Sequence, residues 1–173
     1  MARAGRNDAN AQVMEILAEN VVDANGDLVG RNKIQSHNLI ALYFSARWCP
    51  PCKLFTPVLK EAYAAVRQEY GAAELEVVFV SYDRDAEDWK WYVGQMPWLS
   101  IPFHNEYAAA MLKVQYEVSA IPRLVVIDTR GRTIVSNARG GDLFGIGNDA
   151  LLAYKQIRNN VVDKDAKAKE STG

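Results

Sequence analysis

The chain has 173 residues, of which 20 are Lys or Arg, 21 are Asp or Glu and 49% are hydrophobic. This length is that of a single domain, and a net charge of -1 gives no reason to expect nonspecific binding to nucleic acid or membrane surfaces, which depends on clustered cations. The two cysteines are too few for a disulfide scaffold, and no apolar run approaches the ~20 residues of a membrane-spanning helix. We therefore expect a monomer in the cytoplasm that binds neither nucleic acid nor membrane.

The two ends of the chain lack the apolar periodicity of packed helices or strands. Residues up to 10 contain no apolar stretch, and residues 164–173 form a polar run rich in lysine. We expect residues 1–10 and 163–173 to be disordered and residues 11–162 to form the folded domain.

Between these ends, apolar strands alternate with amphipathic helices. A short helix around residues 13–17 is expected first, followed by a β-hairpin over residues 21–29 that turns at Asn25-Gly26. The elements that follow are predicted as a buried strand at 39–45, a helix at 50–70, a strand at 75–82, helices at 85–95 and 105–118, a hairpin at 124–135 and a helix at 148–160. Strands separated by helices imply parallel crossovers, and the late hairpin adds antiparallel strands. The pattern predicts an α/β fold in which a central mixed β-sheet is flanked by helices on both faces, with an extra N-terminal β-hairpin.

Cys49 and Cys52 lie where a predicted buried strand gives way to a helix. The positive end of a helix stabilises a thiolate, so Cys49 is the expected nucleophile of thiol–disulfide exchange. Cys52, one turn further and more buried, is expected to resolve the mixed disulfide and release the product. Pro50 and Pro51 fix the turn between the two sulfurs, and Trp48 offers an apolar surface beside them.

Three other interpretations of the cysteine pair stay open. Together with His37 and His104, the two cysteines total four possible zinc ligands, although their spacing matches no common zinc module. A structural disulfide closing so short a loop would contribute little entropy and is rare inside cells. Two unreactive core thiols are the third alternative. We expect redox chemistry without a metal or a cofactor.

The segment Tyr43-Phe-Ser-Ala-Arg-Trp-Cys-Pro-Pro-Cys-Lys53 resembles the active-site segment of the tryparedoxin and nucleoredoxin branch of the thioredoxin superfamily. Phe55-Thr-Pro-Val58, Met96-Pro-Trp-Leu99 and Ile121-Pro122 follow in the order of that branch's landmarks. The resemblance, which covers roughly residues 20–140, implies a thioredoxin fold.

The same resemblance implies a chemistry and a set of partners. The expected reaction is dithiol–disulfide exchange with protein disulfides, on peroxidase-type or other redox targets. A low-molecular-weight dithiol or a reductase is the expected electron donor. The alternative is a nucleoredoxin-like, redox-regulated binding module with little turnover.

Further site residues follow from the resemblance. Pro122 takes the place of the cis-proline that faces the sulfurs in this superfamily, and if this bond is cis, the backbone of Ile121 can pair with an extended substrate. The alternative is a trans proline at the edge of a strand. Tyr43 stands where ordinary thioredoxins have a buried aspartate that helps to move a proton. Proton transfer is therefore expected to use water or another acid.

Four cations, Arg47, Lys53, Arg84 and Arg123, lie near the predicted site in the sequence. If they form a rim around it, they lower the pKa of Cys49 and favour acidic or glutathione-like partners over trypanothione, which carries a cationic polyamine bridge. The alternative is that these side chains point into water as ordinary solvated charges.

Overall fold

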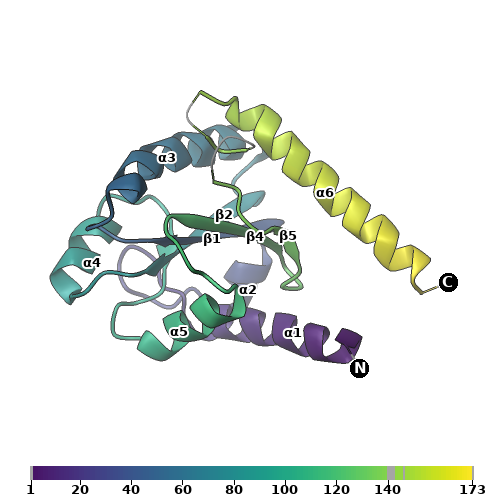
Figure 1. Cartoon of the computed structure of the whole chain (residues 1–173), viewed down its shortest axis with the longest axis horizontal. Helices are drawn as coiled ribbons and strands as arrows, with labels where there is room; N and C mark the ends of the chain where they lie inside the picture. Colours follow the sequence, from purple (N-terminus) through teal and green to yellow (C-terminus); the bar gives the residue numbers. More distant parts are fainter. Residues whose placement is uncertain (1, 140–142, 146, 173) are drawn as a thin grey trace.

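The computed structural model describes residues 2–139, 143–145 and 147–172 (Figure 1). Its strands are β1 Leu39–Ser45, β2 Leu75–Ser81, β3 Leu99–Ser100, β4 Arg123–Asp128 and β5 Thr133–Val135. They form a five-stranded sheet in the order β3-β2-β1-β4-β5. β1 pairs with β2 in parallel and with β4 in antiparallel, β2 pairs with β3 in parallel, and β4 pairs with β5 in antiparallel. The predicted mixed sheet and its late hairpin are confirmed.

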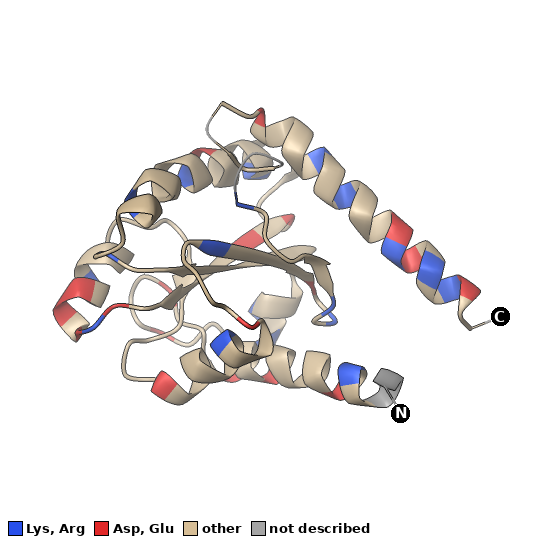
Figure 2. Cartoon of the chain, viewed as in Figure 1, with Lys and Arg blue, Asp and Glu red and all other residues tan. Residues whose placement is uncertain are grey.

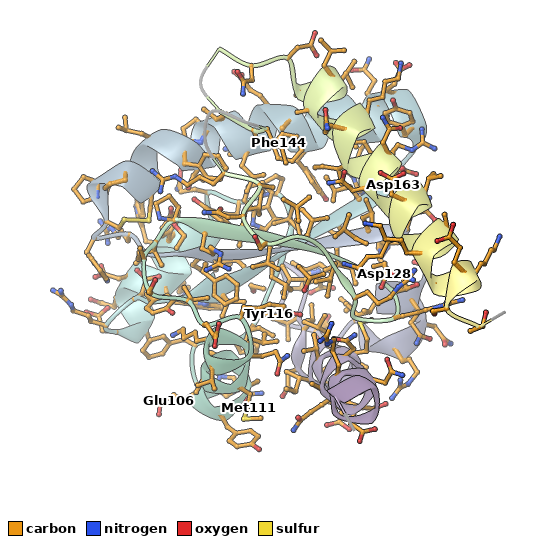
Figure 3. All side chains as sticks on the ribbon, turned by 45° about the vertical axis from the view of Figure 1, so that its right-hand side comes forward. Glu106, Met111, Tyr116, Asp128, Phe144 and Asp163 are labelled. Atoms are coloured by element: carbon orange, nitrogen blue, oxygen red, sulfur yellow. A yellow bond between two sulfur atoms is a disulfide. The ribbon has the colours of Figure 1, made fainter. Side chains whose placement is uncertain are left out.

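Helices cover both faces of this sheet (Figure 1). They are α1 Ala2–Asn20, α2 Gly30–Gln35, α3 Pro50–Tyr70, α4 Ala86–Val93, α5 Glu106–Gln115 and α6 Ala150–Glu170. Residues of α3, α4 and α6 share one core with the sheet, and residues of α1, α2 and α5 share the other. Tyr116, just beyond α5, turns toward the sheet, where its ring centroid lies 6.4 Å from that of Phe44 (Figure 3). Among the described helices, none is long and apolar enough to cross a membrane.

The central strand β1 is buried along its whole length, as its apolar sequence predicts. Alternate residues point to opposite faces of a strand. Leu39, Ala41 and Tyr43 accordingly belong to the core on the α3 side, and the residues between them belong to the core on the α1 side. Both layers therefore fix the end of β1, and the chain that leaves this end leads directly to the cysteines.

Near both ends the chain is helical, whereas the sequence predicts disorder there. Met1 and Gly173 lie outside the described residues. α1 begins at Ala2, and α6 continues to Glu170 (Figure 1). Charged residues crowd the last turns of α6 (Figure 2), where Asp165 pairs with Arg132 at 2.6 Å. A Cβ atom at Gly131 would overlap the backbone of Asn10, so the β4–β5 turn packs closely on α1. These contacts are polar or involve the backbone, and apolar periodicity does not reveal them.

The expected N-terminal hairpin is reduced to a single antiparallel bridge between Val22 and Leu28. The predicted turn is present, with Gly26 at a φ of 82°. However, the N–H of Val22 donates to the carbonyl of Ser100 at 2.9 Å, so this residue also bridges β3. The segment is attached to the edge of the sheet through Val22, which explains why two separate strands do not develop. The short elements α2 and β3 were not expected from the sequence.

Candidate active site

The cysteine pair lies at the N-terminus of α3, which begins at Pro50 and ends at Tyr70 as predicted. Cys49 is the residue that caps the helix, and its Sγ accepts a hydrogen bond from the N–H of Cys52 at 3.4 Å. Pro50 and Pro51 occupy the first helical positions, where a missing N–H costs nothing. The sulfur of Cys49 therefore lies at the positive end of a long helix, where a thiolate is stabilised.

Cys49 and Cys52 are joined by a disulfide whose Cα atoms are 5.2 Å apart. Cys49 is 4% exposed and Cys52 is fully buried. Ala46 completes the small apolar cluster around them, and Tyr82 and Ile121 pack against it. Because Cys52 is enclosed, a thiol or disulfide that approaches from outside meets Cys49 first.

The peptide bond between Ile121 and Pro122 is cis, as the resemblance implies. The carbonyl oxygen of Ile121 lies 3.8 Å from the Sγ of Cys49. β4 begins immediately afterwards, at Arg123. A chain that paired with the backbone at Ile121 would consequently run past the sulfur of Cys49.

Trp48 lies half-exposed beside the disulfide, and its indole N–H donates to the carbonyl of Tyr82 at 2.9 Å. The guanidinium of Arg84 lies 4.8 Å from the centre of the Trp48 ring. The segment that follows β2 thus holds the tryptophan in place. The Trp48 ring is thus partly exposed, and a cation covers one of its faces.

The four cations do not form one unpaired group. Arg47 makes a 2.8 Å ion pair with Asp88, and its guanidinium lies 4.2 Å from the centre of the Trp91 ring. Arg123 donates from Nε to the carbonyl of Ser136 at 2.7 Å, and its charge lowers the pKa of Tyr82, although burial raises that pKa overall. Arg84 and Lys53 are exposed. The expected rim is therefore divided: Arg47 and Arg123 make polar contacts of their own, Arg84 is exposed but lies over the Trp48 ring, and Lys53 is exposed.

Two charged residues near Tyr82, Asp83 and Lys113, are partly buried, which the sequence does not predict. Burial raises the pKa of Asp83, and hydrogen bonds from Ser81 and from the backbone N–H of Arg47 oppose that effect. Burial lowers the pKa of Lys113, whose Nζ lies 3.9 Å from the centre of the Tyr82 ring. Asp83 precedes the acidic first turn of α4, and its hydrogen bonds brace the loop that leads to Trp48.

The structure does not assemble the four zinc ligands considered from the sequence. His37 lies just before β1, with its Nδ1 3.0 Å from the carbonyl of Lys33 and its Nε2 3.5 Å from Glu76. The full length of β1 separates it from Cys49. Within the described ranges, no group of three or more His, Cys, Asp or Glu residues could hold a metal ion.

A set of buried hydroxyl groups beneath Cys52 was also not anticipated. They belong to Tyr43, Ser45, Thr56 and Tyr92, which come from β1, α3 and α4. The sequence offers one signal: Thr56 is a polar residue on the face of α3 that is otherwise buried and apolar.

Residues 37–133 match the family described as thioredoxin-like. Over 115 residues the chain is 40% identical to the tryparedoxin of Trypanosoma brucei brucei. The aligned region covers 66% of this chain and 73% of that protein. Over 125 residues it is 35% identical to the nucleoredoxin of Mus musculus, which covers 72% of this chain. The match spans 28% of the mouse protein, so this chain corresponds to a part of it.

The fold is similar to that of tryparedoxin II from C. fasciculata, with a TM-score of 0.65 and 32% identity. The similarity covers 72% of this chain and 84% of that one. The region matched by the family includes both cysteines and the cis-proline. The chain therefore belongs to the tryparedoxin and nucleoredoxin branch of the thioredoxin superfamily.

Proposed function

We propose that the chain is a thiol–disulfide oxidoreductase that acts on protein disulfides through Cys49 and Cys52. The observation that carries this proposal is the position of Cys49. It caps α3, is joined to Cys52 and lies 3.8 Å from the backbone carbonyl of Ile121. Membership of the family adds support, since this pair stands at the family's active-site position.

In the proposed reaction the dithiol form of the protein supplies two electrons. The Cys49 thiolate attacks one sulfur of a substrate disulfide, and the other substrate sulfur leaves as a thiolate. Cys52 then attacks Cys49 in the mixed disulfide, which forms the Cys49–Cys52 bond and releases the second substrate thiolate. The proton of the Cys52 thiol passes to solvent. A low-molecular-weight dithiol or a reductase returns the protein to its dithiol form.

The surface around Cys49 favours an extended polypeptide as the substrate. The backbone of Ile121 offers hydrogen-bonding groups in the manner of strand addition. Trp48 offers an apolar surface next to the sulfur and is 42% exposed. Both lie beside the sulfur that a substrate disulfide must reach.

The electron donor can be identified by comparing reduction rates of the oxidised protein. Arg84 and Lys53 are the exposed cations of the predicted rim, while Arg47 is paired with Asp88. We expect this side of the site to favour a glutathione-like donor over trypanothione, because like charges repel. Matched assays with glutathione, trypanothione and a thioredoxin-reductase system test this. Fastest reduction by trypanothione would contradict it.

The reaction itself is tested by the reduction of insulin disulfides with dithiothreitol as the donor. The wild-type protein should accelerate the precipitation of insulin chains, and Cys49→Ser should abolish the acceleration. If the wild-type protein, with Cys49 shown to be free, gives no rate above that of dithiothreitol alone, the proposal is wrong.

A second candidate function is a redox-regulated binding module. Trp91 is 50% exposed, so it adds a second tryptophan to the surface near the site, and such a surface suits a protein partner. A capture experiment with Cys52→Ser separates the two functions. Many partners held through mixed disulfides favour the enzyme. A single noncovalent partner, released on oxidation, favours the module.

A further inference from the structure

Four buried hydroxyl groups form a connected set beneath the first turn of α3. The Thr56 hydroxyl lies 2.7 Å from the hydroxyl of Tyr43 and 2.7 Å from that of Tyr92. The Tyr92 hydroxyl lies 2.7 Å from that of Ser45, and Thr56 itself lies 2.9 Å from the carbonyl oxygen of Cys52. All four residues are buried. The set therefore joins β1, α3 and α4 at the backbone of Cys52.

The Thr56 hydroxyl donates to the carbonyl oxygen of Cys52, since a carbonyl oxygen can only accept. The Tyr43 hydroxyl lies 3.5 Å from the same carbonyl oxygen and 2.7 Å from the Thr56 hydroxyl, so its proton can serve either acceptor. The Thr56 oxygen has two lone pairs, and it can accept from Tyr43 and Tyr92 while it donates to Cys52. Thr56 therefore links the set to the backbone of Cys52.

This arrangement places no charged group in the set. Burial raises the pKa of Tyr43 above its ordinary value, so Tyr43 stays neutral. The hydroxyl set cannot take up a proton as a buried carboxylate would. What it provides is a fixed anchor, because the Cys52 carbonyl accepts a hydrogen bond from a side chain that two tyrosines hold in place.

We propose that Thr56 and Tyr92 are positioning residues that hold Cys52 for its attack on the mixed disulfide. This inference rests on the proposed function and concerns its second step alone. In that step the Cys52 thiolate forms the bond to Cys49, and the substrate sulfur leaves with the electron pair of the broken bond. Cys49 itself is bonded to none of the four hydroxyls, so its first attack does not depend on them.

The test is a stopped-flow reaction of the reduced full-length protein with one equivalent of the aromatic disulfide dithionitrobenzoate. The first thionitrobenzoate is released when Cys49 attacks the reagent, and the second when Cys52 attacks the mixed disulfide. Thr56→Val should slow the second release by about tenfold, the equivalent of one lost buried hydrogen bond. Tyr92→Phe should slow it in the same direction, and both variants should leave the first release unchanged.

Two further variants serve as controls. Thr56→Ser keeps the hydroxyl and should restore the second release. Tyr63→Phe removes a buried hydroxyl from the same helix, one that donates to Glu76 at 3.0 Å, and should leave both releases unchanged. If Thr56→Val and Tyr92→Phe leave the second release unchanged, or slow both releases equally, the positioning role is wrong. A wild-type protein that releases no thionitrobenzoate would instead overturn the proposed function.

Discussion

At one end of β1, beneath the cysteines, the buried polar groups are the neutral hydroxyls of Tyr43, Ser45, Thr56 and Tyr92. At the other end, they are carboxylates. Glu76 is 4% exposed and lies 3.5 Å from His37 and 3.6 Å from Arg67. Glu74, equally enclosed, accepts from Asn38 at 2.6 Å and pairs with Arg158 at 3.2 Å.

The difference bears on the chemistry of the site. A fixed charge near a thiol shifts its pKa and thereby changes its reactivity. The hydroxyls beneath Cys52 are neutral, so this set adds no charge to the stabilisation that the N-terminus of α3 gives a thiolate. The buried ions lie a full strand away, where they join α3, β2 and α6 without acting on the sulfurs. Substitutions at the hydroxyl end of β1 should therefore change the redox reaction, and substitutions at the charged end should change the stability of the fold.

The largest effect is expected at the charged end. Glu76→Ala leaves His37, Arg67 and Tyr63 without the carboxylate that they share. Breaking a buried pair in this way should lower the free energy of unfolding by about 3 kcal/mol. Urea denaturation measures this loss, and the rate of insulin reduction measured well below the transition should stay unchanged. A lower rate of insulin reduction in Glu76→Ala would contradict the claim that the carboxylates at the charged end do not affect the cysteines.

A somewhat smaller effect is expected at the turn between β4 and β5, which also lies at the charged end. Gly131 has a φ of 77°, and a Cβ atom there would overlap the backbone of Asn10. Gly131→Ala should cost about 2 kcal/mol through backbone strain and the displacement of α1. Gly26→Ala is the matched control, because that glycine also has a positive φ but no neighbour near its Cβ position. Equal losses in both variants would show that α1 does not pack closely on the turn.

The position of the cysteines could be predicted because local rules decide it. Pro50 and Pro51 favour the first turn of a helix, and the apolar residues that follow recur with helical spacing. The sheet could be predicted for a similar reason, since its strands are continuous apolar runs. These signals lie within one element and need no knowledge of its neighbours.

The hydroxyl set could not be predicted, because it depends on packing between distant segments. Thr56 and Tyr92 are 36 residues apart and meet only when α4 lies beside α3. Arg123 shows the same limit: it is adjacent to the cis-proline in sequence, but its contact with Ser136 depends on the packing of β4 beside β5. The helical ends also depend on contacts between distant segments, such as the Gly131 turn against Asn10 of α1 and Arg132 against Asp165 of α6.

The charged end should also respond to pH. Burial lowers the pKa of His37, although Glu76 and the hydrogen bond to the Lys33 carbonyl act in the opposite direction; the charges of Lys33 and Arg67 add to the lowering. Between the unfolded value of about 6.5 and the lower folded value, the unfolded chain binds a proton that the folded chain does not. Stability should therefore decrease as the pH falls through this window. Urea midpoints measured across it test the direction, and His37→Gln should flatten the curve. A wild-type midpoint that rises as the pH falls would contradict this assignment.

The smallest effect is expected where charge is exposed. Asp165 pairs with Arg132 at 2.6 Å, and Arg132 lowers the pKa of Asp165. The Asp165 side chain is 49% exposed, and screening by solvent and salt reduces the value of such a pair. Asp165→Asn should therefore leave the redox rate unchanged and lower the Tm only slightly, with less difference from wild type at high salt.

Because Arg132 also pairs with the buried Asp128 at 2.6 Å, Asp128→Asn should lower the Tm much further. Equal losses from the two variants would show that the end of α6 is held as firmly as the buried carboxylates.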